Sequence, residues 1–84
     1  MKPVRMTTHA RLQCAERGTN QQEVEQAVRE GTREPAKRGR TLCRFNLAFN
    51  SSWQDTHYAV KQVAPVIKEE ADGIVVITVY VFYF

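Results

Sequence analysis

The sequence predicts an α+β domain in which two N-terminal helices pack on an antiparallel sheet of three or more strands. Two observations predict this class. Apolar residues recur at helical spacing between positions 8 and 31, where capping residues also stand at the expected ends. From position 40 onward, apolar residues alternate or run continuously, which is typical of strands. With 84 residues, 43% of them apolar, the chain is expected to form one domain, residues 1–84.

The helices are predicted from their capping residues. Thr8 is a suitable N-cap for the first helix, and Gly18 is suited to end it in a left-handed conformation. The second helix is expected to close at Gly31, with Val24, Ala27 and Val28 facing the core. Its start carries two overlapping capping boxes, Thr19 with Gln22 and Asn20 with Glu23.

Three strands are expected after a polar loop over residues 32–39. The first begins at Arg40 and places the side chains of Thr41, Cys43, Phe45, Leu47 and Phe49 on one face. The second covers residues 56–63, and Pro65 near its end predicts a bulge or a sheet edge because proline cannot donate to a ladder. A continuation of this strand over residues 66–69 is left open. A hairpin turn at residues 71–73 leads to the third, residues 74–83, which is apolar on both faces and therefore expected in the middle of the sheet.

Positive charge is concentrated in the first half of the chain. Residues 1–44 carry ten Lys or Arg against five Glu, whereas residues 45–84 carry two Lys against four Asp or Glu. Such a basic segment attracts the phosphate backbone of nucleic acids. The alternatives are a solvated loop and a docking surface for an acidic partner. The predicted nucleic-acid-binding residues are Arg33, Lys37, Arg38, Arg40 and Arg44.

The remaining composition argues against several classes of protein. Cys14 and Cys43 lie 29 positions apart and form no metal-ligand set with the two histidines, so neither a metal site nor another cofactor is expected. Two reduced thiols are typical of a cytoplasmic protein. No signal peptide is visible, and the longest apolar run, residues 74–84, is far shorter than the ~20 residues of a membrane span. The sequence therefore predicts a cytoplasmic protein with no membrane segment.

Two motifs resemble a known family. The run His9-Ala10-Arg11 leading to Glu16-Arg17-Gly18, the Glu-rich second helix, and Val75-Val76-Ile77-Thr78-Val79-Tyr80 resemble a small bacterial family of domains of unknown function. That family has a histidine-led helix ending in Arg-Gly and a final strand ending in Thr-x-Tyr. The resemblance covers residues 8–31 and 56–80. The family is similar in layout to RelE-like toxins and to the fold group of barnase and colicin-type ribonucleases.

The resemblance implies a helical layer against an antiparallel sheet, a RelE- or barnase-like layout, and a set of candidate residues. His9 and Arg17 match the family's helix positions, Thr78 and Tyr80 match its final strand, and Lys61 falls on a middle strand that often carries a polar residue. One departure is that RelE-type toxins usually end in a short helix or tail that supplies a catalytic residue, whereas the residues up to Phe84 have strand character.

Two functions follow as hypotheses. The first is an RNA-binding domain or toxin-type, metal-independent endoribonuclease, with His9 as acid or base, Arg17 and Lys61 at the phosphate, and Tyr80 completing the set. Each residue also has a structural interpretation, such as capping for His9 and ion pairing for Arg17. The second is a non-catalytic interaction module whose last strand pairs with a protein, such as an antitoxin, or with a second copy in a homodimer. Convergence of His9, Lys61 and Tyr80 on one open surface would favour the enzyme.

Overall fold

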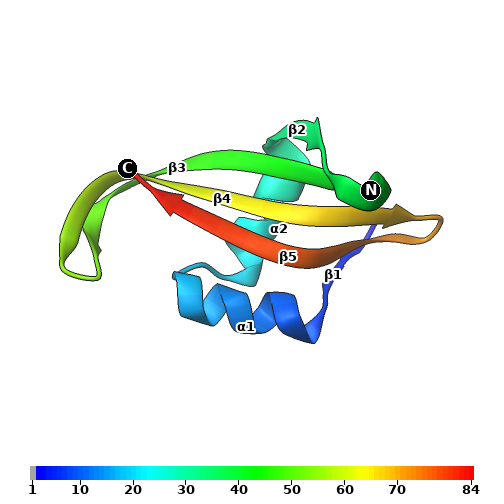
Figure 1. The fold of residues 1–84 in the computed structure, drawn as a ribbon, viewed down its shortest axis with the longest axis horizontal. Helices are drawn as coiled ribbons and strands as arrows, with labels where there is room; N and C mark the ends of the chain where they lie inside the picture. The colour runs from blue at the N-terminus through cyan, green and yellow to red at the C-terminus, as the bar shows by residue number, and fades with distance from the viewer. Residues whose placement is uncertain (1) are drawn as a thin grey trace.

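The structure, a computed structural model, describes residues 2–84. This part of the chain contains two α-helices, one short 3-10 helix and five strands. Figure 1 shows these elements in chain order, from blue to red. They are β1 (Val4–Met6), α1 (Thr8–Arg17), α2 (Gln21–Glu30), β2 (Thr32–Pro35), the short 3-10 helix η1 (Lys37–Gly39), β3 (Thr41–Trp53), β4 (Thr56–Glu70) and β5 (Gly73–Tyr83).

The five strands form one mixed sheet in the order β1-β5-β4-β3-β2. β1 runs parallel to β5, with Val4 opposite Ile74, and the other neighbours are antiparallel. The prediction of an antiparallel sheet beneath two N-terminal helices is therefore wrong, because a strand precedes the helices and one pair is parallel. The two missed strands lack the usual signal. β1 has only three residues, and all four residues of β2 are exposed, so neither shows a periodic apolar pattern.

Both helices occur where the capping residues predict them. The N-cap of α1 is Thr7 rather than Thr8, and its hydroxyl accepts a hydrogen bond from the Ala10 amide at 3.1 Å. Gly18 ends α1 with a φ of 79°, the left-handed conformation that favours glycine. The Asn20 side chain caps α2 by accepting from the Glu23 amide at 2.9 Å. Local capping chemistry thus sets the position of both helices.

The long strand β4 continues past Pro65, and of the two alternatives predicted for this proline the structure has the bulge and not the sheet edge. β3 continues through Trp53, and β4 passes through Pro65 to Glu70 in the interior of the sheet. The register of β3 and β4 has Leu42 opposite Val66 and resumes with Phe45 opposite Val63, so pairing is interrupted beside Pro65. A bulge lies next to it on the β5 side, between Val66 and Ile67. The proline is accommodated by this local break in the ladder.

One face of the sheet is covered by the helices and the other is not. α1 lies against β5 and β1, and α2 lies against β3 and β4; in Figure 1 α2 crosses behind the strands. The core between these two layers contains small and β-branched side chains: Ala10, Cys14, Val24, Ala27, Val28, Cys43, Val63, Ile67, Ile74, Val76 and Val79. In residues 2–84, no helix is both long and apolar enough to cross a membrane.

Candidate nucleic-acid interface

Lys61, one of the predicted catalytic residues, is buried between the sheet and the helices. Its side chain is 9% exposed. Lys61 Nζ lies 2.7 Å from Glu23 Oε1 on α2 and donates to the Gly18 carbonyl at the end of α1 at 2.9 Å. The Thr19 hydroxyl donates to the same Glu23 oxygen at 2.9 Å. The ammonium group therefore joins β4 to the ends of both helices.

Aromatic side chains surround the turn at Gly18. The ring of Tyr83 stacks on Trp53 with centroids 5.1 Å apart, and its hydroxyl donates to the Arg17 carbonyl at 2.7 Å. Burial, and secondarily the charge of Glu23, raises the pKa of Tyr83. A Cβ on Gly18 would lie 2.5 Å from the Tyr83 hydroxyl oxygen. Trp53 packs within this cluster.

The four predicted catalytic residues do not converge on one surface. His9 is exposed in the first turn of α1 and Arg17 lies in its last turn, about 12 Å further along the axis at ~1.5 Å per residue. Lys61 faces the helices, whereas Tyr80 lies on the opposite face of the sheet and is 43% exposed. Only Arg17 and Tyr80 come together: the guanidinium carbon lies 5.6 Å from the centre of the Tyr80 ring.

The face of the sheet opposite the helices carries an unusual set of side chains, and we call it the open face. Its residues form cross-strand rows: Leu42, Val66 and Thr78, then Arg44, Ala64 and Tyr80, then Asn46, Gln62 and Phe82. Tyr80 and Phe82 stand side by side with ring centroids 6.3 Å apart and planes inclined by 19°. Phe82 is 41% exposed. Exposed aromatic rings on a sheet are available for stacking.

Arg17 and Arg44 place a guanidinium against each of these two rings. Arg17 extends from the end of α1 and donates to the Val79 carbonyl at 2.6 Å as well as lying over Tyr80. Arg44 lies over Phe82, 5.7 Å from the ring centre, and is held by Glu34 at 3.2 Å and by Gln62 at 3.0 Å. The aromatic pair is thus bordered by cations, which adds cation–π attraction to the surface.

A hollow of about 270 Å³ adjoins Tyr80 at the end of the open face nearest η1. Lys37 and Arg40 line it, together with Ala36, Leu42, Val66 and Thr78. Within residues 2–84, no carboxylate pairs with either of these two cations. Unpaired cations beside exposed rings are the combination that single-stranded nucleic acids require.

The other predicted nucleic-acid-binding residues have different surroundings. Arg33 pairs with Glu69 at 3.1 Å and donates to the Val28 carbonyl at 2.9 Å, so it ties β2 to α2 and β4. Arg38 is exposed in η1 with a left-handed φ of 62°, outside the residues that line the hollow. Of the five, Lys37 and Arg40 line the hollow at Tyr80, and Arg44 lies over Phe82 on the same face.

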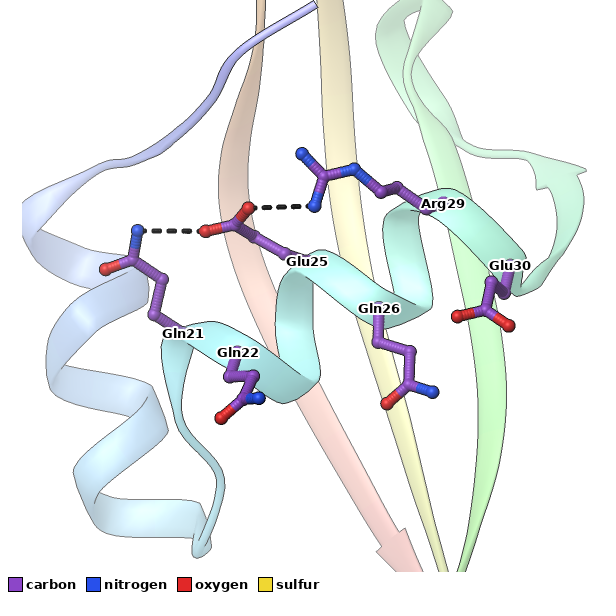
Figure 2. A pocket seen from close by; sticks show the side chains of 6 residues that line it. All are labelled: Gln21, Gln22, Glu25, Gln26, Arg29 and Glu30. Atoms are coloured by element: carbon purple, nitrogen blue, oxygen red, sulfur yellow. Dashed lines mark hydrogen bonds and ion pairs between the residues drawn. The ribbon is translucent and has the colours of Figure 1, made fainter. Parts of the chain in front are cut away.

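Another hollow, about 610 Å³, lies on the outer surface of α2, and all its lining residues come from this helix (Figure 2). Gln21 donates to Glu25 at 3.1 Å, and Arg29 donates to the same carboxylate at 3.0 Å. These are ordinary i, i+4 pairs on a solvent-facing helix surface. No second element brings a functional group to it, so the open face remains the stronger candidate site.

Residues 2–84 contain no cluster of three or more side chains that could bind a metal ion.

Comparisons with protein-family models, with curated proteins and with solved structures find no match.

Neither Phe82 nor the contact of Arg44 with its ring was predicted from the sequence. The signal for Phe82 was the alternation Tyr80, Phe82, Phe84, which places three aromatic residues on one face of a strand. Arg44 carried no such signal, because its contact with Phe82 depends on the register of β3, β4 and β5.

Proposed function

We propose that the protein binds single-stranded RNA on the open face. The observation that carries this proposal is the exposed pair Tyr80 and Phe82, bordered by the guanidinium groups of Arg17 and Arg44. Single-stranded nucleic acids bind where aromatic rings stack with bases and cations accompany the backbone. Lys37 and Arg40, beside Tyr80, supply the cations for the backbone.

The proposed activity is binding without cleavage. Metal-independent cleavage needs an acid and a base within hydrogen-bond reach of the same phosphodiester. Neither histidine lines the hollow at Lys37 and Arg40, and Lys61 faces the helices instead of the open face. The open face therefore offers stacking and phosphate contacts but lacks a histidine pair for proton transfer at the hollow.

The test is a fluorescence-anisotropy titration of the protein with a labelled 12-nucleotide single-stranded RNA at several salt concentrations. We expect saturable binding, and an affinity about tenfold or more lower for the variant Lys37→Ala/Arg40→Ala. Each lost phosphate contact reduces the slope of log K against log salt by about 0.7 for single strands. The double variant should therefore show a slope smaller by about 1.4.

Matched variants separate the open face from general charge. Arg11→Ala/Arg29→Ala removes the same number of charges from the helical side of the molecule and should bind RNA nearly as well as the parent. His9→Ala should also bind normally, and the RNA should be recovered intact on a denaturing gel. Equal losses in both double variants, or no binding by the parent, would contradict the proposal.

A protein partner on the same surface is the competing outcome, because the exposed row Tyr80, Phe82 and Phe84 is apolar. Sedimentation equilibrium of the parent and of the Tyr80→Arg variant shows whether the open face binds a second copy of the chain. A dimer that Tyr80→Arg converts to a monomer, combined with absent RNA binding, would assign the open face to a second copy and overturn the RNA proposal.

A further inference from the structure

Four side chains that can donate hydrogen bonds line the hollow at the end of the open face nearest η1. They are Lys37, Arg40, Thr78 and Tyr80. Within residues 2–84, neither cation pairs with a carboxylate, and neither hydroxyl group forms a hydrogen bond with another group of the chain. No Asp or Glu lines the hollow. The four donors are therefore available to a ligand, and the two positive charges favour an anion.

The turn between β2 and β3 holds the two cations in place. The Ala36 amide donates to the Arg40 carbonyl at 2.8 Å, and the Arg40 amide donates to the Lys37 carbonyl at 3.3 Å. Between them, Arg38 and Gly39 have left-handed φ values of 62° and 72°. Lys37 and Arg40 thus belong to one closed turn, so a ligand that binds both of them has little backbone to order.

The floor of the hollow comes from three neighbouring strands. Leu42 of β3 stands opposite Val66 of β4, and Val66 stands opposite Thr78 of β5. Tyr80 lines the hollow as well, and its ring stands beside Phe82. The hollow is therefore bounded by the sheet and by the turn, and it adjoins the aromatic pair of the open face.

The size and the charge of the hollow favour a phosphate monoester. Pockets that hold whole small ligands measure about 300–1,000 Å³. This hollow measures about 270 Å³, so it suits a group smaller than a whole nucleotide. A phosphate monoester carries a charge of about −1.5 to −2 at pH 7 and has three terminal oxygens, whereas a diester of the RNA backbone carries a single charge and has two. Two cations and two hydroxyl groups match the monoester better than the diester.

We propose that the hollow binds a phosphate monoester at the end of the RNA strand. Lys37 and Arg40 neutralise its charge. The hydroxyl groups of Thr78 and Tyr80 donate to its oxygens. This inference rests on the proposed function and narrows it to single strands that end in a phosphate. The terminal bases then lie on the aromatic pair, because Tyr80 borders both the hollow and Phe82.

The test compares anisotropy titrations of four internally labelled RNAs, each built from a single repeated nucleotide. Two 9-nucleotide strands end in a phosphate, one at the 5′ end and the other at the 3′ end, and a third has hydroxyl groups at both ends. An 11-nucleotide strand with hydroxyl ends has two more diesters and therefore matches the total charge of the phosphorylated strands. We expect one of the two phosphorylated strands to bind about tenfold or more tightly than the 11-nucleotide strand, because hydrogen bonds to a charged group are the stronger ones.

Variants that lack one hydroxyl group locate this phosphate preference, which is the affinity for the phosphorylated strand divided by that for the 11-nucleotide strand. Thr78→Val and Tyr80→Phe should each lower the preference about fivefold, because each keeps the shape of the side chain and removes one hydrogen bond to the phosphate. Thr56→Val is the matched control, since Thr56 is exposed at the start of β4, outside the hollow, and should leave the preference unchanged. Thermal unfolding of each variant verifies that it is folded.

The outcomes distinguish this inference from the proposed function. Equal affinity for the phosphorylated strands and the 11-nucleotide strand would overturn the terminal-phosphate site while leaving RNA binding intact. A phosphate preference that is unchanged in both Thr78→Val and Tyr80→Phe would also overturn it, since the phosphate would then bind elsewhere. Failure of the parent to bind these four strands and the 12-nucleotide RNA would overturn both proposals.

Discussion

Lys61 Nζ and Glu23 Oε1 form an ion pair of 2.7 Å that joins the middle of the sheet to the first turn of α2. Lys61 also donates to the Gly18 carbonyl, one of the groups that a helix leaves unpaired at its C-terminal end. Lys61 is one of the residues predicted to contact the phosphate. In the structure, the same lysine stabilises the junction of the two helices.

Lys61→Met is expected to lower the free energy of unfolding by about 2–4 kcal/mol, measured by urea denaturation. The reason is that Glu23 and the Gly18 carbonyl would lose their buried partner; the loss is moderated because the Glu23 side chain is 25% exposed. Lys68→Met, at an exposed position on the same strand, should change stability by less than about 0.5 kcal/mol. A Lys61→Met variant of unchanged stability with weakened RNA binding would instead indicate a phosphate contact.

Gly18→Ala is expected to lower the free energy of unfolding by about 2–5 kcal/mol. Gly18 has a left-handed φ, and an added Cβ would overlap Tyr83 and Trp53. Gly39 provides a matched control, since it also has a left-handed φ but no atom would lie within 4 Å of an added Cβ. Gly39→Ala should cost only about 1–2 kcal/mol. Equal losses at the two glycines, measured by urea denaturation, would show that the aromatic cluster does not constrain the turn.

Gln13→Leu is expected to destabilise the protein by about 1–3 kcal/mol. Gln13 Oε1 accepts from the Val79 amide at 2.7 Å, at a point where β5 continues beyond the end of β1. The substitution leaves that buried amide without its acceptor. The amide proton of Val79 should also exchange faster with solvent, whereas Gln13→Glu, which retains an acceptor, should show a smaller change. Unaltered exchange at Val79 in Gln13→Leu would contradict this role.

Stability is expected to fall in alkaline solution. Burial raises the pKa of Cys14 and Cys43 above the ordinary value of 9.0, and burial with the charge of Glu23 raises the pKa of Tyr83 above 10.0. The folded state therefore keeps these protons at pH values where the unfolded chain has released them. The free energy of unfolding is unaffected by these groups below their ordinary pKa values and decreases as the pH rises above them.

Urea denaturation between pH 7 and 11 measures this decrease in the free energy of unfolding, and the decrease above pH 10 should be smaller in Tyr83→Phe. A Tyr83→Phe profile identical to that of the parent would contradict the contribution of Tyr83.

Helix positions could be predicted because their determinants are local. Thr7, Gly18 and Asn20 act on amides or carbonyls within one turn of chain, so their effect is readable from neighbouring residues. The N-cap of the first helix is Thr7 instead of the predicted Thr8, because either of these adjacent threonines can cap a helix. The presence of β3 and β5 was also predicted, because both strands have clear apolar patterns.

The sheet could not be predicted in full, because its edge strands depend on their neighbours. β1 is formed by hydrogen bonds to residues 74–76, and β2 by hydrogen bonds to residues 41–44. Neither β1 nor β2 has an apolar pattern of its own. At Pro65 the sequence left a bulge and a sheet edge as alternatives, and pairing with the neighbouring strands decides for the bulge. The strand continues there because β3 and β5 pair with it on either side of the interruption.

The two helices, the basic segment and the aromatic alternation at the end of the chain can be read from residue type and short-range spacing. Which charged residues remain available depends instead on the folded arrangement of the helices and the sheet. It buries Lys61 with Glu23, pairs Arg33 with Glu69, and leaves Lys37 and Arg40 beside Tyr80. Charge pairing is a matter of distance in space, and residues 36 or more positions apart are brought within about 3 Å only by the register of the sheet and the packing of the helices upon it.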